Sequence, residues 1–535
     1  MQRNRAIYPP GEVHNKIPYT GRVKINTLRL LITQGCCELT DIMGNYVNGE
    51  FVEDGKKTKL VSPADGSEVA TVVLGSRKSA IEAIDAADFA FHNAWVKTSI
   101  GERQKLLAKL ATLVQDKSYE YARMESANTG KTMRQSTLMD IPLGISHIEY
   151  FSSTQEFKFS REITHPEYPD TTGIVQNAPM GVIGAIAPWN VPFLMAVWKI
   201  APAILAGNTI VLKPSHHTPA TALMLARDIQ EAGFPPGVIN IVAGTGTEVG
   251  NTLCTDDRVS MISFTGSTQT GKKIMGMAAE NLKKVTLELG GKSPNIVLPD
   301  ADLEHAAKGI LFGIFLNSGQ LCESGSRLLV HHSVKDRLLK TMEKHLQGMK
   351  AGNPLDMETE ISAITTQDQL KKITNLVDEG KSQGATVVFQ RQLADQVPGN
   401  GLFFPPTILD NVTQSMTVAR EEIFGPVLTV TEFSHTDEAV RIANSSKYGL
   451  ASGLWTRDMK AATNIGSQIE AGTVWINDYH LLSAAAPRGG FKKSGIGREL
   501  GLEGILEYTQ TRHLFLNEHE SDFDRVAYGL IISDE

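Results

Sequence analysis

The sequence predicts an α/β fold built on parallel sheets, and two observations support this prediction. First, five short runs are rich in Val and Ile and show no polar alternation, at residues 182–187, 209–212, 238–242, 261–264 and 295–298. Second, Gly or Pro follows each run, and a helical pattern of apolar residues comes next. Strands that are apolar on both faces and are separated by helices are typical of a parallel sheet covered on both sides, as in nucleotide-binding domains.

The remaining elements fit the same class. Apolar residues at spacings of three and four over residues 79–115 predict two amphipathic helices on either side of Trp95. Between the strands, residues 220–231 and 271–279 have helical spacing as well. From residue 301 a second α/β cycle follows, with helices predicted at 301–316, 334–349, 367–379 and 436–444 and strands at 326–331, 385–389, 427–432 and 472–477. Two similar halves predict two α/β domains with a cleft between them.

Composition and charge exclude several classes of protein. The chain has 535 residues, of which 41% are hydrophobic and 21% are charged, so a disordered or coiled-coil chain is excluded as the main interpretation. The net charge of −7 leaves no basic surplus for a phosphate backbone, and we expect no nucleic-acid partner. Prolines, asparagines and a lysine interrupt the most apolar stretch, residues 181–212, so we expect neither a transmembrane span nor a membrane partner.

The cysteines and the two ends of the sequence bear on the compartment. Four irregularly spaced cysteines without a CxxC pair indicate neither a disulfide framework nor structural zinc, so we expect no metal site and a reducing, cytoplasmic location. Residues 1–43 are basic, but prolines spoil the amphipathic helix of an organelle presequence, which predicts an N-terminal extension. Residues 517–535 predict an acidic, peripheral tail. The cysteines are Cys36, Cys37, Cys254 and Cys322.

Two glycine turns follow predicted strands. Residues 266–273 nearly match the phosphate loop of NTPases, but Lys273 replaces the hydroxyl residue that would hold Mg²⁺. What remains is a helix N-terminus whose free N–H groups suit a phosphate oxygen, such as the pyrophosphate of a dinucleotide. Gly244, Gly246 and Gly250 form the second turn. Taken alone, either loop fits an ordinary turn between a strand and a helix better than a ligand site.

Cys322 lies in a polar, glycine-flanked segment, residues 317–326, between an apolar helix and a strand. Most single cysteines are small buried hydrophobes in apolar runs. The surroundings of Cys322 instead favour a nucleophile, because a thiolate is the most effective side-chain nucleophile near neutral pH and needs a polar or electropositive setting to form.

Two further residues could assist such a nucleophile. Glu288 ends an apolar strand before two glycines, where a carboxyl with a raised pKa would suit a general base; an ion pair with Lys292 is an equally good interpretation. Asn190 lies between two prolines at a strand end, where its amide could donate a hydrogen bond to a developing oxyanion. As a simple turn former, Asn190 would fit equally well.

The sequence resembles the NAD(P)-dependent aldehyde dehydrogenase superfamily from about residue 45 to residue 515. The resemblance rests on several motifs in the order that the family has, and no single short match would carry it. These motifs occupy residues 188–190, 212–215, 264–268, 287–292, 319–322, 421–427 and 490–495.

The resemblance implies a reaction and its residues. It makes Cys322 the nucleophile that attacks an aldehyde, Asn190 with the Cys322 backbone N–H the oxyanion hole, and Glu288 the base that activates water. It also places Lys199 near the site. An aldehyde would be oxidised to a carboxylic acid through a thiohemiacetal and a thioester, with NAD as cofactor and NADP possible. A cysteine-dependent acyl hydrolase or esterase without redox turnover is the alternative.

For the cofactor, the resemblance puts Lys213 at the adenosine ribose, Ser267 at the pyrophosphate, and Glu422 at the nicotinamide ribose beside Phe424. The other implied cofactor residues are Trp189, Ser215, His216, Gly246, Gly250, Phe264, Gly266 and Leu289. Two positions depart from the family pattern. His216 replaces a Glu that is usual in NAD-preferring members, which opens NADP use. Arg488 stands where the family often has an aromatic or apolar residue, and a substrate-side or intersubunit contact would be altered there.

The resemblance also implies an aldehyde-dehydrogenase-like architecture: a Rossmann-like cofactor domain, an α/β catalytic domain and a β arm that joins subunits into a homodimer or homotetramer. The expected division is an extension at 1–43, a cofactor-binding domain at 44–157 and 179–290, a catalytic domain at 291–490, an oligomerisation arm at 158–178 and 508–516, and an acidic tail at 517–535.

Overall fold

The computed structural model describes residues 42–168, 171–393, 396–517 and 530–531. The predicted extension therefore lies outside the described residues except for its last two positions, and most of the predicted acidic tail lies outside them as well. The fold below is that of the unit formed by Ile42–Glu535.

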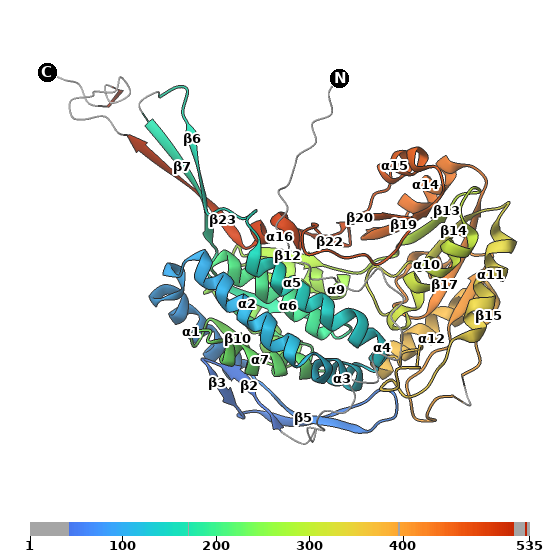
Figure 1. The fold of residues 1–535 in the computed structure, drawn as a ribbon, viewed down its shortest axis with the longest axis horizontal. Coiled ribbons are helices and arrows are strands. Elements are labelled where there is room, and N and C mark those ends of the chain that lie inside the picture. The colour runs from blue at the N-terminus through green and yellow to red at the C-terminus, as the bar shows by residue number, and fades with distance from the viewer. Residues whose placement is uncertain (1–41, 169–170, 394–395, 518–529, 532–535) are drawn as a thin grey trace. The chain divides into compact units, whose positions relative to one another are not determined.

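The first of two large sheets has eight strands in the order β22-β12-β11-β8-β9-β10-β2-β3. Figure 1 labels β2, β3, β10, β12 and β22 of this sheet. The five strands from β12 to β10 are parallel, and antiparallel strands complete both edges. The strands are β2 (Asn45–Val47), β3 (Glu50–Val52), β8 (Val182–Ile186), β9 (Thr209–Lys213), β10 (Ile239–Ile241), β11 (Val259–Thr265), β12 (Lys284–Glu288) and β22 (Gly495–Ile496).

The strand order reverses between β8 and β11. From β8 the chain runs through β9 to β10 on one side, and it then returns to the other side for β11 and β12. Open α/β sheets bind ligands outside the carboxyl ends of their strands at such a switch point. The segments that follow β8 and β11 carry Asn190 and Ser267, so the topology alone directs attention to this edge.

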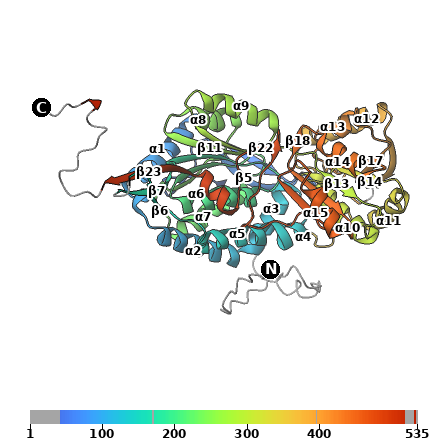
Figure 2. The same cartoon turned by 90° about the horizontal axis from the view of Figure 1, so that it is seen from above.

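Helices cover both faces of the first sheet. Helices α1, α8 and α9 contribute to one apolar core that includes Ile84, Leu253 and Ile274, and α6 and α7 cover the opposite face with α2 and α5 beyond them (Figure 2). Side chains of Ser76 and Ser99 cap α1 and α2 in capping boxes. The helices are α1 (Arg77–Asn93), α2 (Ile100–Asp116), α3 (Ser118–Thr129), α4 (Met133–Gln135), α5 (Ile141–Ser153), α6 (Pro192–Ala206), α7 (Ala220–Ala232), α8 (Asn251–Thr255) and α9 (Thr268–Ala279).

The second sheet has seven strands in the order β15-β16-β17-β14-β13-β19-β20, all parallel except β15. One core packs α10 and α11 on one face, and another packs α14 and α15 on the other. The strands are β13 (Pro294–Val297), β14 (Arg327–His331), β15 (Thr386–Gln390), β16 (Thr407–Asp410), β17 (Val427–Phe433), β19 (Ala451–Trp455) and β20 (Thr473–Ile476). The helices are α10 (Leu303–Phe315), α11 (Lys335–Gly348), α12 (Gln367–Ser382), α13 (Thr417–Arg420), α14 (Thr436–Asn444) and α15 (Met459–Gly466). Helix α16 (Gly501–Glu507) packs against α6 and β23 instead.

A separate three-stranded antiparallel sheet has the order β23-β7-β6 and extends away from the helices (Figure 1). It consists of β6 (Ser160–Thr164), β7 (Thr171–Pro179) and β23 (Thr509–Asn517). The remaining small sheets are formed by β1 (Ile42–Met43), β4 (Lys56–Val61) and β5 (Glu68–Leu74), and by β18 (Tyr448–Gly449) and β21 (Phe491–Lys492).

The predicted α/β class with parallel sheets is confirmed, and the predicted strands agree with β8 to β11, β13, β14, β15, β17 and β20 to within two residues. Elements that the sequence did not predict include α6, β16 and β19. None of the helices in the described part of the chain is long and apolar enough to cross a membrane. The predicted domain boundaries stay a prediction.

Candidate active site

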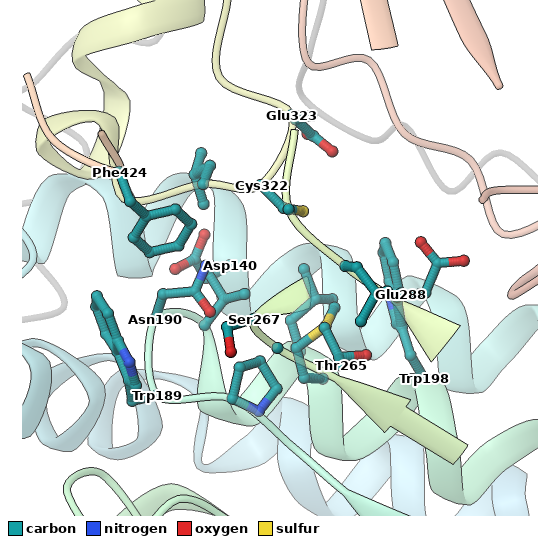
Figure 3. A pocket seen from close by; sticks show the side chains of 18 of the residues that line it. Asp140, Trp189, Asn190, Trp198, Thr265, Ser267, Glu288, Cys322, Glu323 and Phe424 are labelled. Carbon is teal, nitrogen blue, oxygen red and sulfur yellow. The ribbon is translucent and has the colours of Figure 1, made fainter. Parts of the chain in front are cut away.

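A cavity of about 170 Å³ lies where the carboxyl ends of β8, β11 and β12 face loops of the second sheet. Figure 3 shows Cys322, Glu288 and Asn190 around it. Residues far apart in the sequence therefore share one enclosed space. The predicted site residues that line it are Trp189, Asn190, Gly266, Ser267, Glu288, Leu289, Cys322, Glu422 and Phe424.

Cys322 follows α10 on a tight turn. Asn317 and Ser318 both have a φ of 49°, in the left-handed region that ordinary residues rarely adopt. Hydrogen bonds hold the turn in this conformation: the Ser318 hydroxyl donates to Ser362 O at 2.6 Å, and Gln320 Nε2 donates to Ala363 O at 3.0 Å. Such strain persists only where the surroundings enforce it, and it is common at active sites.

Cys322 lines the cavity and is partly exposed. Burial raises its pKa to about 11, and the charges of Glu288 and Glu422 act in the same direction. The Arg488 guanidinium opposes them. Because the thiolate is the nucleophilic form, the balance between these groups decides the reactivity of the sulfur.

Glu288 ends β12 and is 6% exposed. Its Oε1 atom has no hydrogen-bond partner among the described residues. Burial and then the charge of Glu499 hold the pKa of this carboxyl well above its usual range, against the opposing charges of Arg488 and Lys199. The ionised form of a carboxyl with a raised pKa is a stronger base than an ordinary carboxylate and can accept a proton from water.

The alternative interpretation of Glu288, an ion pair with Lys292, is wrong. Lys292 Nζ is buried without a hydrogen-bond partner among the described residues, and burial lowers its pKa to about 7. No ion pair joins the two side chains in the described part of the molecule.

Hydrogen bonds hold both the side chain and the backbone carbonyl of Asn190. Its Nδ2 donates to Gln320 O at 2.8 Å, and its carbonyl accepts a hydrogen bond from Asn317 Nδ2 at 3.2 Å. An amide nitrogen has two hydrogens, so one remains to donate into the cavity. The backbone N–H of Cys322 donates to no other described residue. These two donors could hold one oxyanion.

Lys199 does not line the cavity. It is fully buried in α6, where its Nζ lies 2.7 Å from Glu499 Oε1 and 3.1 Å from Ser263 Oγ. Glu499 does line the cavity. Lys199 therefore contacts the cavity only indirectly, through its ion pair with Glu499.

One side of the cavity offers groups for a nicotinamide ribose. Glu422 Oε1 accepts from Gly291 N at 3.0 Å, and a Cβ at Gly290 would lie 2.5 Å from Glu422 Oε2, so a larger residue there would displace the carboxylate. Burial raises the pKa of Glu422, and the charge of Lys372 opposes this. The rings of Trp189 and Phe424 meet edge to face at 5.3 Å between centroids.

The N-terminus of α9 adds a site for phosphate oxygens. Ser267 caps this helix by accepting from Thr270 N at 3.2 Å, and the first backbone N–H groups of a helix have no intrahelical acceptor. A Cβ at Gly266 would lie 2.5 Å from the ring of Phe264. Phe264 therefore sets the close turn below the helix end and does not line the cavity itself.

The residues expected at the adenosine lie together but away from this cavity. Lys213 is 4% exposed and its Nζ donates only to Pro214 O among the described residues, while burial lowers its pKa to about 8. A Cβ at Gly250 would lie 3.8 Å from the Lys213 chain, and the space beside Gly246 is open. Ser215 is buried beside them, and His216 is half-buried.

A buried ammonium with one weak acceptor, an open glycine turn and a free helix N-terminus suit an oxygen-rich ligand. The residues present therefore fit a dinucleotide that runs from Lys213 past Ser267 to Glu422.

Sequence reasoning missed three residues of the site. The sequence marks Arg488 only as a departure from the family pattern, and it suggests no role for Glu323 and His480. The structure brings these three side chains into one cluster beside Cys322. The adjacency of Glu323 to Cys322 was the available signal, but its partners lie more than 150 residues away.

Comparison with known proteins identifies the family of this chain. The sequence matches the model of the Aldehyde dehydrogenase family over residues 51–514. It is 41% identical over 476 residues to betaine aldehyde dehydrogenase from Bacillus subtilis (strain 168), which covers 88% of this chain and 97% of that protein. An aldehyde dehydrogenase of Emericella nidulans is 40% identical over 474 residues, with 88% and 94% covered.

Solved structures agree. The NAD+ complex of aldehyde dehydrogenase from Bacillus cereus has a TM-score of 0.86 at 39% identity and covers 90% of this chain and 97% of that chain. Betaine aldehyde dehydrogenase from Staphylococcus aureus in complex with NAD+ has a TM-score of 0.87 at 37% identity, with 91% and 96% covered.

The fold and the cavity define a class of enzyme with a cysteine at the ligand-binding edge of a nucleotide-type sheet. The chain belongs to the aldehyde dehydrogenase family. It oxidises an aldehyde to a carboxylic acid with NAD+, so the sequence prediction of an NAD(P)-dependent aldehyde dehydrogenase is confirmed.

Proposed function

We propose that Cys322, Glu288 and Asn190 carry this oxidation in the roles that the sequence predicts. The observation that supports the proposal is their position around one cavity with the predicted nicotinamide residues. Cys322 Sγ, as thiolate, forms a bond to the aldehyde carbon. The carbonyl oxygen becomes an alkoxide, and Asn190 Nδ2 and the Cys322 N–H donate to it.

When bound, NAD+ supplies a hydride acceptor. As the alkoxide returns to a carbonyl, Cys322 is left in a thioester. Glu288 then takes a proton from water, the resulting hydroxide attacks the thioester, and the carbon–sulfur bond breaks to release the acid and the thiolate.

For the cofactor we propose three groups of residues. Trp189, Glu422 and Phe424, with Leu289 and Gly266, hold the nicotinamide half. Ser267 and the N-terminus of α9 hold the pyrophosphate. Lys213, Ser215 and His216, with Gly246 and Gly250, hold the adenosine half. His216 carries no carboxylate to repel a 2′-phosphate, so we propose NAD as cofactor and NADP as a second one.

We propose an aldehyde without a quaternary ammonium group as substrate, although two relatives are named betaine aldehyde dehydrogenases. Aromatic faces recognise such cations, but the Arg488 guanidinium carbon lies 5.8 Å from the Trp198 ring centroid in the cavity wall. The ratio of kcat/KM for 3,3-dimethylbutanal to that for trimethylammonioacetaldehyde, its charged isostere, tests this. A ratio below one would contradict it.

We further propose that the sheet of β6, β7 and β23, which we call the arm, joins subunits into a homodimer or homotetramer. Leu514 and Leu516 are more than a third exposed on alternate positions of β23. Edge strands of this kind are available for pairing with another chain.

The decisive experiment is the substitution Cys322→Ala. We expect it to abolish reduced-cofactor formation with every aldehyde and also cleavage of an activated ester, because both need the sulfur. Surviving oxidation would remove the proposed mechanism. Wild-type ester cleavage without any aldehyde oxidation would instead support the hydrolase alternative. Cys254→Ala, at a cysteine buried in the core, is the matched control.

A further inference from the structure

Arg488 brings a guanidinium to the wall of the cavity next to the nucleophile. Its Nη2 lies 4.0 Å from Cys322 Sγ, and the residue is 4% exposed. The residue comes from the loop between β20 and β21, so the contact joins parts of the chain that are 166 positions apart. Nothing in the reaction described above uses this cation.

Arg488 is held rigidly. Its backbone N–H and carbonyl pair with those of Glu499 at 2.7 Å each. Its guanidinium forms an ion pair with Glu323 and lies over the Trp198 ring. A side chain fixed by backbone, ion pair and aromatic ring loses little further freedom when it acts on a neighbour.

The ion pair with Glu323 would cancel the charge of Arg488 if both groups were simply ionised. The hydrogen bonds of His480 argue against this. His480 Nε2 lies 3.1 Å from Gly313 O, and its Nδ1 lies 2.8 Å from Glu323 Oε1. The carbonyl can only accept, so Nε2 carries a hydrogen, and a second hydrogen must lie between Nδ1 and Oε1.

This proton count decides the charge of the cluster. Burial lowers the pKa of His480 to about 4, which favours a neutral ring, and the second proton then lies on the Glu323 side of this hydrogen bond. If the proton lay on His480 instead, the total charge of the three side chains would be the same. In both arrangements Arg488, Glu323 and His480 together carry one positive charge.

We propose that Arg488 is a catalytic residue that stabilises the thiolate of Cys322, and that Glu323 and His480 share a proton so that this charge is not neutralised. The proposal rests on the role of Cys322 given above. The other groups that face the sulfur, the carboxyls of Glu288 and Glu422 and the hydroxyl of Tyr479, contribute no positive charge. Arg488 is thus the cation that offsets the burial of the thiol.

The size of the effect can be bounded. An opposite charge within about 4–6 Å lowers the pKa of an ionisable group by about one to three units. Below the pKa, the thiolate fraction rises tenfold for each pH unit. Removing the charge should therefore slow any reaction of the thiolate at pH 8 by about tenfold or more.

The test measures the thiolate without aldehyde oxidation. Iodoacetamide alkylates Cys322 in the full-length protein, the extent is read from the Cys322 peptide by mass spectrometry, and the rate is recorded from pH 6 to pH 10. We expect Arg488→Gln to lower the alkylation rate at pH 8 by about tenfold or more. Arg488→Met supplies a second neutral variant, Arg488→Lys should retain most of the rate, and the exposed Arg457→Gln is the control.

Glu323→Gln tests the proton count. Glutamine matches a protonated carboxyl, so it can donate to His480 and accept from Arg488, and we expect an alkylation profile within about threefold of wild type. A much faster rate would show that Glu323 neutralises Arg488 and would overturn the proposal. An unchanged rate in folded Arg488→Gln or Arg488→Met, checked by NAD+ binding, would overturn it too. Failure of Cys322→Ala to abolish oxidation would instead refute the proposed function.

Discussion

Burial raises the pKa of Glu288, so its ionised form is a stronger base than an ordinary carboxylate, and the proposed reaction uses that base. We expect Glu288→Gln to slow thioester hydrolysis by about 10² to 10⁴, the range for a lost general base, while hydride transfer changes little. Rapid-mixing measurements should show a full burst of reduced cofactor followed by slow turnover. Loss of the burst would place Glu288 in the first half-reaction.

The same substitution should change stability in a pH-dependent way. The pKa of Glu288 is higher in the folded state than in the unfolded state. As pH rises above about 4.5, the unfolded chain therefore loses this proton while the folded protein still keeps it. Ionising this carboxyl therefore costs stability at higher pH. Glu288→Gln should raise the free energy of unfolding at pH 8 and have less effect near pH 4.5, as measured by urea titration. An equal effect at both values would contradict the raised pKa.

His216 bears on the choice of cofactor. Burial, followed by the charges of His217 and Lys213, lowers its pKa to about 4, so the ring is neutral near pH 7. We expect His216→Glu to weaken NADP relative to NAD by about tenfold, because a carboxylate repels a 2′-phosphate. The ratio of kcat/KM for the two cofactors measures this, with the neighbouring His217→Glu as control. An unchanged ratio would contradict the role of His216.

Site residues could be predicted from the sequence where the residues next to them in the chain indicated a role. Cys322, Glu288 and Asn190 lie in motifs whose local context, a strand end, a glycine turn or a proline-framed loop, suggests chemistry. The roles of Arg488 and Glu323 depend on the contact between them. This contact joins residues far apart in the sequence, and the sequence alone does not show it. Whether Glu288 faced Lys292 or the cavity was open for the same reason.

At the scale of elements, α10 packs unusually close to β19. A Cβ at Gly309 would collide with the Trp455 ring, which is itself fixed by a hydrogen bond from Nε1 to Asn295 Oδ1 at 3.0 Å. We expect Gly309→Ala to lower the free energy of unfolding by about 1–3 kcal/mol through overpacking. Chemical denaturation measures this.

Gly276 provides the matched control, since it lies in α9 and a Cβ added there would have nothing within 4 Å. Gly276→Ala should stabilise the protein by about 0.5–1 kcal/mol, because alanine is the better helix former. Equal effects of the two substitutions would show that Trp455 moves aside freely.

The elements that were missed have physical reasons. Helix α6 contains Pro192 and Pro202, and prolines usually interrupt a helix; here Pro192 occupies the first turn, where no N–H is needed. Strand β19 has the sequence Ala-Ser-Gly-Leu-Trp, which lacks β-branched residues. Its position between β13 and β20 buries it completely, and packing overrides propensity there.

At the scale of the whole molecule, the arm should control assembly. We expect Leu516→Asp, on β23, to shift the protein towards monomers in light-scattering measurements, because a charge on this face opposes burial against a second subunit. Leu282→Asp, at a position 93% exposed in the turn after α9, is the control. An arm variant that keeps the wild-type mass would show that subunits join elsewhere.

Strand β22 joins the first sheet beside β12, the strand that ends at Glu288. Leu289 N donates to Ser494 O at 2.8 Å, and Ser494 Oγ donates to Gly290 O at 2.7 Å, so late residues brace both sides of the turn after the base. During translation, the earlier strands emerge from the ribosome more than 200 residues before their last neighbour. A nascent chain can thus form most of the first sheet before β22 is made, while the turn after Glu288 still lacks the hydrogen bonds from Ser494. We expect the active site to be complete only at the end of synthesis.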